Sequence, residues 1–349
     1  MDTFRHLQQP TGRKVWVQGR EYLFFGGTAY LGLLVDPDYI EIYKNGIHRY
    51  GLNNGTSRSN NVQLAIYEEV ESHLAKRFGM EQCLVLSSGY LAAQLCIQQL
   101  KRLGQVLYAP GAHPALWDGE ASVPKSAFSS WAGETVGYIN RSPHDSFVIV
   151  TNTFDNLTPA VHDFSPFDHI AEDKQIYFLL DDSHGIGVQA AYTFAVNPDR
   201  LRGHKREVVV VASLAKGMGT DAGAIFCSQE MASLFRNSPI FSGASPSSPA
   251  SLYALIAGEW VYRRQVERLQ QNISRLQVLL GAGFTSIPAF PVFTVGKVGA
   301  FDDFLQQNIL ISSFPYPSAK DPTINRIVLS ALHQQEDIER LGAVASAIR

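Results

Sequence analysis

The middle of the chain alternates short apolar runs with segments whose apolar residues recur at helical spacing. Residues 89–104 repeat Ala93, Cys96, Ile97 and Leu100 at the spacing of a helix. Runs as apolar as those around this helix are buried on both faces, which is typical of a mostly parallel sheet flanked by helices. The predicted strands are 82–88, 105–109, 147–152, 176–182, 208–213 and 223–228.

The pattern changes after residue 235. A long segment, 251–283, carries charge on one face and apolar residues on the other, which predicts an amphipathic helix. Shorter apolar segments follow, and the chain ends in a second amphipathic pattern. The predicted elements of this part are 291–297, 308–314, 324–332 and a closing helix at 334–348.

These patterns predict an α/β protein in three parts. Residues 1–45 form an N-terminal segment. Residues 46–235 form a large domain with a mostly parallel sheet flanked by helices. Residues 236–349 form a smaller C-terminal α+β domain.

Composition narrows the class of protein. Of the 349 residues, 45% are hydrophobic and 17% are charged, with a formal net charge of -3, so nothing favours a nucleic-acid partner. We see no signal peptide and no run of 18 apolar residues, so we expect no membrane span. Cys83, Cys96 and Cys227 lie in apolar contexts and are expected to be reduced core residues. Together these points predict a cytoplasmic globular protein without a structural metal.

Polar side chains stand where the predicted strands end. In an open parallel sheet, ligands bind outside the carboxyl ends of the strands. The set mixes acid, base and amine, and it calls for one ligand that needs all of them. Its members are Ser87, Ser88, Gly89, His113, Thr151, Asn152, Asp181, Asp182, His184, Ser213 and Lys216.

Lys216 follows the apolar strand 208–213 on a glycine-rich turn, and three interpretations of it stay open from its own surroundings. The first is a solvated loop lysine, the second is a member of a dinucleotide-binding turn, and the third is a nucleophile that holds a cofactor covalently. The stretch "GMGTDA" fits the dinucleotide pattern G-x-G-x-x-A, but the next element is a strand where that pattern needs a helix. A surface lysine does not explain the polar set at the other strand ends.

Pyridoxal phosphate explains the whole set. It needs a Schiff-base lysine, an acid facing its pyridine nitrogen, a group over its ring and a phosphate cradle. Asp181 ends an apolar strand and can keep that nitrogen protonated, whereas Asp182 alternates to the opposite face. His184 is placed to reach the ring hydroxyl.

The phosphate has a candidate cradle in the stretch "SSGY". Ser88, Gly89 and Tyr90 open a helix, and backbone N–H groups at a helix N-terminus favour a phosphate. Ser213 can add a hydroxyl donor. Taken singly, each of these features is compatible with an ordinary turn; taken together, at successive strand ends, they favour a pyridoxal-phosphate site.

Five motifs carry a resemblance to a known family. The family's opening segment is matched by "YLFFGGTAYLGL", and its G-x-G-x-x-S-R turn by "RYGLNNGTSRSNN". Its phosphate-binding motif is matched by "LSSGYLAAQ", its aspartate–histidine motif by "DDSHGIGV" and its lysine motif by "SLAKGMG". The chain thus resembles the α-oxoamine synthase group of fold-type I pyridoxal-phosphate enzymes. The resemblance runs from about Tyr22 to the C-terminus. It implies the fold-type I transferase fold and pyridoxal 5'-phosphate as cofactor.

The resemblance also implies roles for single residues. Lys216 would be the Schiff-base lysine, Asp181 would face the pyridine nitrogen, His184 the ring oxygen, and His113 would stack on the ring. The remaining cofactor-binding residues, on the aldehyde or phosphate side, would be Ser88, Gly89, Tyr90 and Ser213. The family is homodimeric with its active site at the interface, and "IFSGASP" (240–246) resembles the part that reaches the partner's phosphate.

Three departures concern the substrate side. Thr28 and Ala29 replace an Asn-Asp pair, and Phe314 stands where an ungapped alignment places the family's carboxylate-binding arginine. Arg326, in "INRIVLS", matches another family arginine and is the candidate substrate residue. Asn156 and Pro159 interrupt a turn that is glycine-rich in the family. The residues that would bind the cofactor are thus nearly all present, whereas those that would recognise the amino acid are altered. We therefore expect either a substrate that is an amine or an unusual amino acid, or another residue that binds the carboxylate.

The function implied is a transferase that condenses an amino acid with an acyl-CoA or another acyl thioester. Lys216 would hold the cofactor and then act as general base at the substrate Cα. An aminotransferase on the same fold is the alternative, and so is a non-catalytic homologue that binds the cofactor without turnover. A nicotinamide-dependent oxidoreductase rests only on "GMGTDA".

Overall fold

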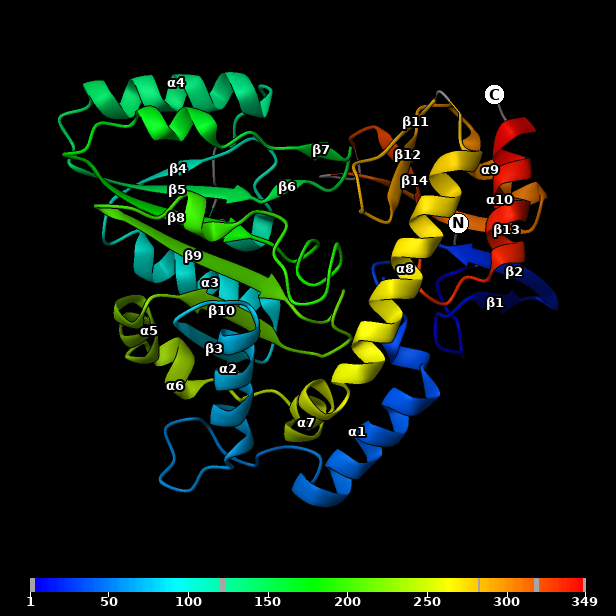
Figure 1. Cartoon of the computed structure of the whole chain (residues 1–349), viewed down its shortest axis with the longest axis horizontal. Coiled ribbons are helices and arrows are strands. Elements are labelled where there is room, and N and C mark those ends of the chain that lie inside the picture. The colour runs from blue at the N-terminus through cyan, green and yellow to red at the C-terminus, as the bar shows by residue number, and fades with distance from the viewer. Residues whose placement is uncertain (1–3, 120–122, 282, 317–319, 348–349) are drawn as a thin grey trace.

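Two six-stranded sheets organise this computed structural model, which describes residues 4–119, 123–281, 283–316 and 320–347 (Figure 1). In order across the larger sheet, the strands are β3 (Gln82–Leu86), β10 (Gly223–Cys227), β9 (Arg206–Ser213), β8 (Gln175–Asp181), β5 (Ser146–Asn152) and β4 (Gln105–Tyr108). Only β10 runs antiparallel to its neighbours β3 and β9. The predicted strands and the mostly parallel sheet are confirmed.

Alternation along β9 explains why this sheet is covered on both faces. Val208 and Val210 belong to one buried apolar cluster, and Val209 and Val211 belong to another. The first cluster takes in α2 (Ile66–Arg77) and α4 (Phe128–Arg141), and the second takes in α3 (Gly89–Leu100) and α5 (Gln229–Arg236). Successive side chains of a strand point to opposite faces, so a run of valines buries both.

The smaller sheet joins the two ends of the chain. Its strands, in order, are β1 (Lys14–Val17), β2 (Arg20–Phe25), β13 (Ile309–Pro315), β14 (Thr323–Val328), β12 (Val292–Val295) and β11 (Phe284–Thr285). β2 pairs in parallel with β13, with Leu23 opposite Ile309. Sequence analysis did not predict this pairing, and the boundaries after residues 45 and 235 stay predictions. α9 (Ala300–Gln306) and α10 (Gln335–Ala347) accompany this sheet.

The expected single helix over 251–283 is wrong. The structure has two helices there, α7 (Pro249–Ala257) and α8 (Glu259–Leu279), separated at Gly258. A Cβ at Gly258 would lie 2.6 Å from the Ala254 carbonyl oxygen and 2.8 Å from the Tyr39 ring. The ring of Tyr39, on α1 (Pro37–Tyr50), therefore packs against the bare backbone where the two helices meet.

The remaining elements are short. A hairpin follows β5, and brief helical turns punctuate the loops. Residue 282 of the predicted helix and Ile348 of the closing helix lie outside the described residues. The short elements are β6 (Phe154–Asp155), β7 (Ala160–Val161), α6 (Pro239–Gly243), η2 (Leu33–Val35), η3 (Pro114–Leu116), η4 (Ser165–His169) and η5 (Pro198–Arg200).

In the ranges that the structure describes, none of the helices is long and apolar enough to span a bilayer.

Candidate active site

The carboxyl ends of β5, β8 and β9 bring the predicted residues to one edge of the larger sheet. Asp181, the last residue of β8, pairs with Asn152 at the end of β5 and with Val211 of β9. Lys216 follows the end of β9 by three residues. The residues that line a small pocket at this edge are His113, Asn152, Thr153, Phe154, Asn156, Asp181 and His184.

Lys216 is a desolvated amine. Its Nζ lies 3.0 Å from Nε2 of His184. Burial lowers the pKa of Lys216 below its ordinary value, and the charge of Asp181 offsets part of that shift. A lysine with a lowered pKa has more neutral amine at a given pH, and the neutral amine is the form that attacks a carbonyl.

His184 is held from both sides of its ring. Its Nε2 faces Lys216, and its Nδ1 lies 2.7 Å from the hydroxyl of Tyr30, which is 1% exposed. Burial, together with the positive charges of Lys216 and Arg326, lowers the pKa of His184 well below its usual range. The imidazole is therefore neutral near pH 7, with one nitrogen that donates and one that accepts.

The two adjacent aspartates occupy different surroundings. Asp181 is half-buried in the pocket, and its Oδ1 accepts a hydrogen bond from the Ser183 amide at 2.9 Å. Asp182 is fully buried; it accepts from the Thr153 hydroxyl at 2.6 Å and from the Ala195 amide at 3.2 Å. Burial raises the pKa of Asp182 to about 8. Asp181 is thus the carboxylate open to a ligand, and Asp182 is a structural group.

The N-terminus of α3 closes on the end of β9. Ser88 caps the helix, and its Oγ accepts from the Leu91 amide at 3.1 Å. A Cβ at Gly89 would lie 2.5 Å from the Cβ of Ser213, and one at Gly223 would lie 2.1 Å from the Ser88 carbonyl oxygen. Only glycine at positions 89 and 223 allows these backbone segments to lie so close together. As a result, the first turn of α3 lies beside Ser213. Such a helix N-terminus suits an anion.

Two of the predicted residues are more open to solvent. Tyr90, in the first turn of α3, is 64% exposed. His113 is exposed, its Nδ1 accepts from the Ala115 amide at 3.1 Å, and its own amide donates to Asn152 Oδ1 at 3.2 Å. His113 shares the pocket with Asp181, whereas Tyr90 does not line it.

Arg326 comes to this region from the smaller sheet. It is 5% exposed, and its Nη1 donates to the Asn156 carbonyl at 3.0 Å. The centre of its guanidinium lies 5.0 Å from the centroid of the Phe314 ring. Its Nε is buried and has no hydrogen-bond partner among the described residues. Phe314 therefore packs on a buried guanidinium. Residues 317–319 of the same loop lie outside the described residues.

Tyr30 and the carbonyl of Asn156 were not predicted as site groups from the sequence. Tyr30 stands in "TAYLGL", next to the two residues that depart from the family, and a tyrosine in an otherwise apolar stretch was the available signal. The role of Asn156 is played by its backbone, which no sequence pattern marks.

Comparison with known proteins finds similar sequences over nearly the whole chain. No family model matches the chain. It is 24% identical to the 8-amino-7-oxononanoate synthase of Aliivibrio fischeri (strain ATCC 700601 / ES114), over 97% of this chain and 91% of that protein. It is 26% identical to the same-named protein of Salmonella paratyphi B, over 97% of this chain and 93% of the relative.

Solved structures share the fold over nearly the whole chain. Serine palmitoyltransferase from S. paucimobilis superposes with a TM-score of 0.82 at 18% identity, over 100% of this chain and 93% of that one. The chain is related to the α-oxoamine synthase group of fold-type I pyridoxal-phosphate enzymes. 8-Amino-7-oxononanoate synthase from Francisella tularensis superposes with a TM-score of 0.71 at 18% identity, over 94% and 98% of the two chains. The predicted fold class is confirmed.

The residues present fit the cofactor of the α-oxoamine synthase group. A desolvated amine, Lys216, stands beside an open carboxylate, Asp181. The N-terminus of α3, at Gly89, lies against Ser213, and a helix N-terminus suits a phosphate. Arg326, from the smaller sheet, has a buried Nε with no hydrogen-bond partner in the described part of the chain.

Proposed function

We propose that this protein is a pyridoxal-phosphate-dependent transferase that joins an amino acid to the acyl group of an acyl thioester such as acyl-CoA. The observation that carries the proposal is the desolvated Lys216 amine, held 3.0 Å from His184 at the strand ends that also present Asp181. The similarity to 8-amino-7-oxononanoate synthases, which extends over 97% of this chain at 24–26% identity, supports acyl transfer over transamination.

Each part of the cofactor has a residue to hold it. Lys216 would bind it covalently, and the carboxylate of Asp181 would hold a proton on the pyridine nitrogen. His184 would donate to the ring oxygen, and His113 would cover the ring. The phosphate would lie against Ser88, Gly89, Tyr90 and Ser213, at the N-terminus of α3.

The chemistry follows from these positions. When bound, pyridoxal phosphate supplies an electron sink that stabilises negative charge at the Cα of the amino acid. The Lys216 amine, once free of the cofactor, would take the proton from Cα, and its lowered pKa increases the fraction that is neutral and able to do so. A bond would then form between Cα and the acyl carbonyl carbon, the thioester C–S bond would break, and the thiolate would leave and take up a proton, balancing the one that Lys216 took from Cα.

Arg326 is our candidate for binding the substrate carboxylate. A guanidinium is the side chain best matched to a carboxylate, and its buried Nε lacks a partner among the described residues. We therefore propose that Arg326 replaces the arginine expected at Phe314, and that Phe314 supports its guanidinium from one face.

A coupled assay tests the function. The protein is saturated with pyridoxal phosphate and given a panel of amino acids together with acyl-CoAs of different chain length, and free thiol is measured. Thiol release that requires both substrates, and that disappears in Lys216→Ala, supports the proposal. Conversion to the pyridoxamine form with release of a keto acid would instead identify an aminotransferase. Bound cofactor with neither product would identify a non-catalytic homologue.

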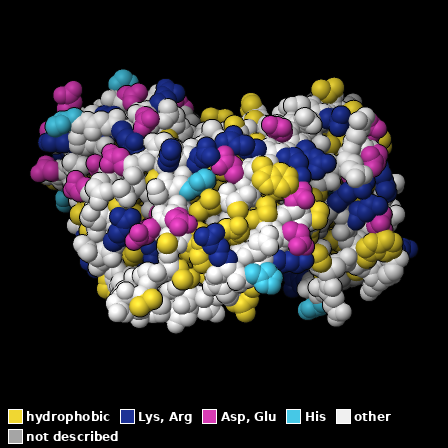
Figure 2. All heavy atoms as spheres, turned by 60° about the horizontal axis from the view of Figure 1, so that its bottom comes forward, with side chains coloured by type: hydrophobic (Ala, Val, Ile, Leu, Met, Phe, Trp, Pro, Cys, Tyr) yellow, Lys and Arg dark blue, Asp and Glu magenta, His cyan; other side chains and the backbone are white. Residues whose placement is uncertain are grey.

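We also propose that the protein is a homodimer with its site at the subunit interface. Large apolar side chains are exposed at Leu52 and Val62, in the loop before α2, and at Tyr90, in the first turn of α3. Figure 2, in which the bottom of Figure 1 is turned toward the viewer, shows hydrophobic side chains gathered across the middle of the molecule. Light scattering on the purified protein tests the mass, and a monomer that turns over at full rate would contradict the proposal.

A cytoplasmic location is the accompanying proposal. Cys83, Cys96 and Cys227 are free and buried, and burial raises the pKa of each thiol, so all three remain protonated and unreactive. Cell fractionation with an antibody to the chain tests it.

A further inference from the structure

Tyr30 and Lys216 meet the two nitrogens of the same imidazole. Tyr30 Oη lies 2.7 Å from Nδ1 of His184, and Lys216 Nζ lies 3.0 Å from Nε2. Tyr30 and His184 are 154 residues apart in sequence, so the contact depends on the tertiary fold. A line of three polar groups thus runs from the buried Tyr30 to the lysine.

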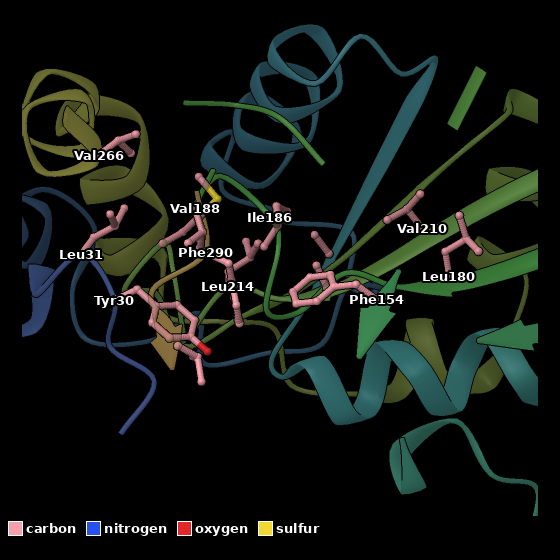
Figure 3. Packing of buried hydrophobic residues seen from close by; sticks show 14 of the residues in the cluster. Tyr30, Leu31, Phe154, Leu180, Ile186, Val188, Val210, Leu214, Val266 and Phe290 are labelled. Atoms are coloured by element: carbon pink, nitrogen blue, oxygen red, sulfur yellow. The ribbon is translucent and has the colours of Figure 1, made fainter. Parts of the chain in front are cut away.

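The tyrosine is held firmly in this position. It is 1% exposed, and its ring packs edge-on against Phe290, with centroids 5.9 Å apart. Figure 3 shows it among apolar side chains that include Leu31 and Phe290, with the hydroxyl at the free end of the ring. Burial raises the pKa of Tyr30 well above its ordinary value, so it keeps its O–H and can either donate or accept.

The neutral ring of His184 has one proton for its two nitrogens. If Lys216 is an ammonium it can only donate, so Nε2 must accept and the ring proton sits on Nδ1, facing Tyr30. If Lys216 does not donate to Nε2, as when methionine replaces it, Tyr30 can donate to Nδ1 and the ring proton moves to Nε2. The hydroxyl of Tyr30 serves both arrangements because it donates and accepts.

We propose that Tyr30 is a positioning residue, whose hydroxyl donates to His184 Nδ1 whenever Lys216 does not donate to Nε2 and so holds the ring proton on Nε2. Nε2 is the nitrogen that faces Lys216, and only a protonated Nε2 can donate to an acceptor oxygen placed there. The consequence for catalysis rests on the proposed function, whereas the tautomer of His184 does not.

The test reads the tautomer directly. The full chain, with ¹⁵N-labelled histidine, carries Lys216→Met, which removes the ammonium and keeps an unbranched side chain of similar length. Long-range ¹H–¹⁵N spectra then show which ring nitrogen of His184 is protonated, with the signal assigned by its loss in His184→Gln. We expect the proton on Nε2. Adding Tyr30→Phe, which keeps the ring and removes the hydroxyl, is expected to abolish this single tautomer and protonate Nδ1 in part of the molecules.

A matched control separates positioning from packing. Tyr67 is also 1% exposed, and its hydroxyl donates to the Ser247 carbonyl at 3.0 Å. Tyr67→Phe removes a buried hydroxyl hydrogen bond just as Tyr30→Phe does, but it should leave the His184 tautomer unchanged. A ring proton on Nδ1 in Lys216→Met, or an unchanged Nε2 tautomer after Tyr30→Phe is added, would overturn the proposal.

The same spectra of the wild-type protein saturated with pyridoxal phosphate extend the test. We expect Nε2 to be protonated there too, and Tyr30→Phe to remove that preference. If the protein binds no cofactor or forms no product, the proposed function fails while the Lys216→Met spectra still decide the role of Tyr30. The two proposals are therefore tested by different measurements.

Discussion

The amine of Lys216 lies 3.0 Å from Nε2 of His184, although the two residues stand on different connections of the larger sheet. The contact places an amine with a lowered pKa against a neutral ring, next to the carboxylate of Asp181.

Lys216 should be the residue that binds pyridoxal phosphate covalently. Borohydride reduction of the saturated protein, followed by peptide mapping, is expected to find the pyridoxyl group on Lys216. Because its pKa is lowered, attachment should begin at a lower pH than the reaction of the cofactor with solvated lysines. A label on another lysine, or none at all, would remove the basis of the proposed function.

Asp181→Asn should abolish most turnover while leaving the cofactor attached. The amide can still accept from the Ser183 N–H but carries no charge. We expect a loss on the order of a hundredfold or more in kcat, typical of removing one preorganised electrostatic group. The change should also lower the pKa of Lys216 further, since Asp181 raises it in the wild type. A larger loss in Asp182→Asn than in Asp181→Asn would show that the roles of the two aspartates are exchanged.

Asp182→Asn should change how stability depends on pH. Burial raises the pKa of Asp182 from 3.8 to about 8, so across that range the folded protein keeps a proton that the unfolded chain has lost. The contribution of Asp182 to stability is present below the unfolded pKa and is lost as the pH rises through the folded one. The free energy of unfolding of the variant should therefore increase relative to wild type over that range, by up to about 1.4 kcal/mol per pH unit. Urea unfolding at several pH values measures it, and a difference that does not vary with pH would contradict the assignment.

Arg326→Lys should weaken amino-acid binding more than cofactor binding. Lysine keeps the charge but loses the planar donors and the packing on Phe314. Losing one charge-assisted contact costs roughly 1.5–3 kcal/mol, or about ten- to a hundredfold in affinity. Titration of the cofactor absorbance with glycine, serine and alanine measures the effect. Phe314→Leu is the control: it should weaken binding less, because the guanidinium remains. Equal affinities in wild type and Arg326→Lys would show that another group binds the carboxylate.

Gly223→Ala should destabilise the cradle at the start of α3. The new Cβ would lie 2.1 Å from the Ser88 carbonyl oxygen and 2.8 Å from the Gly89 nitrogen, both of them backbone atoms. We expect a cost of about 1–3 kcal/mol in the free energy of unfolding and weaker cofactor binding. Gly133→Ala, in α4 and with open space around its Cβ position, is the control and should gain about 0.5–1 kcal/mol. Similar stabilities for the two variants would contradict this view of the close contact.

The sequence by itself determined the larger sheet and one side of the site. Strands buried on both faces appear as continuous apolar runs, and parallel strands end at one edge, so Asp181, His184 and Lys216 could be grouped from their distance to a strand end. The same local pattern predicted one helix where there are two, because the break at Gly258 coincides with the packing of Tyr39 from another part of the chain.

Only the tertiary structure decided the other side of the candidate active site, which Arg326 and Tyr30 form. The contact between Arg326 and the Asn156 carbonyl spans 170 residues, and that between Tyr30 and His184 spans 154. Both bring the smaller sheet and its flanking segments to the edge of the larger one, and the parallel pairing of β2 with β13 ties the N-terminal strands to that sheet. Hydrophobic periodicity reports whether a residue is buried, but not which distant residue it meets, since that depends on how separate sheets pack. The amine, its acid and its histidine could thus be predicted, whereas the tyrosine behind the histidine and the carbonyl that holds the arginine could not.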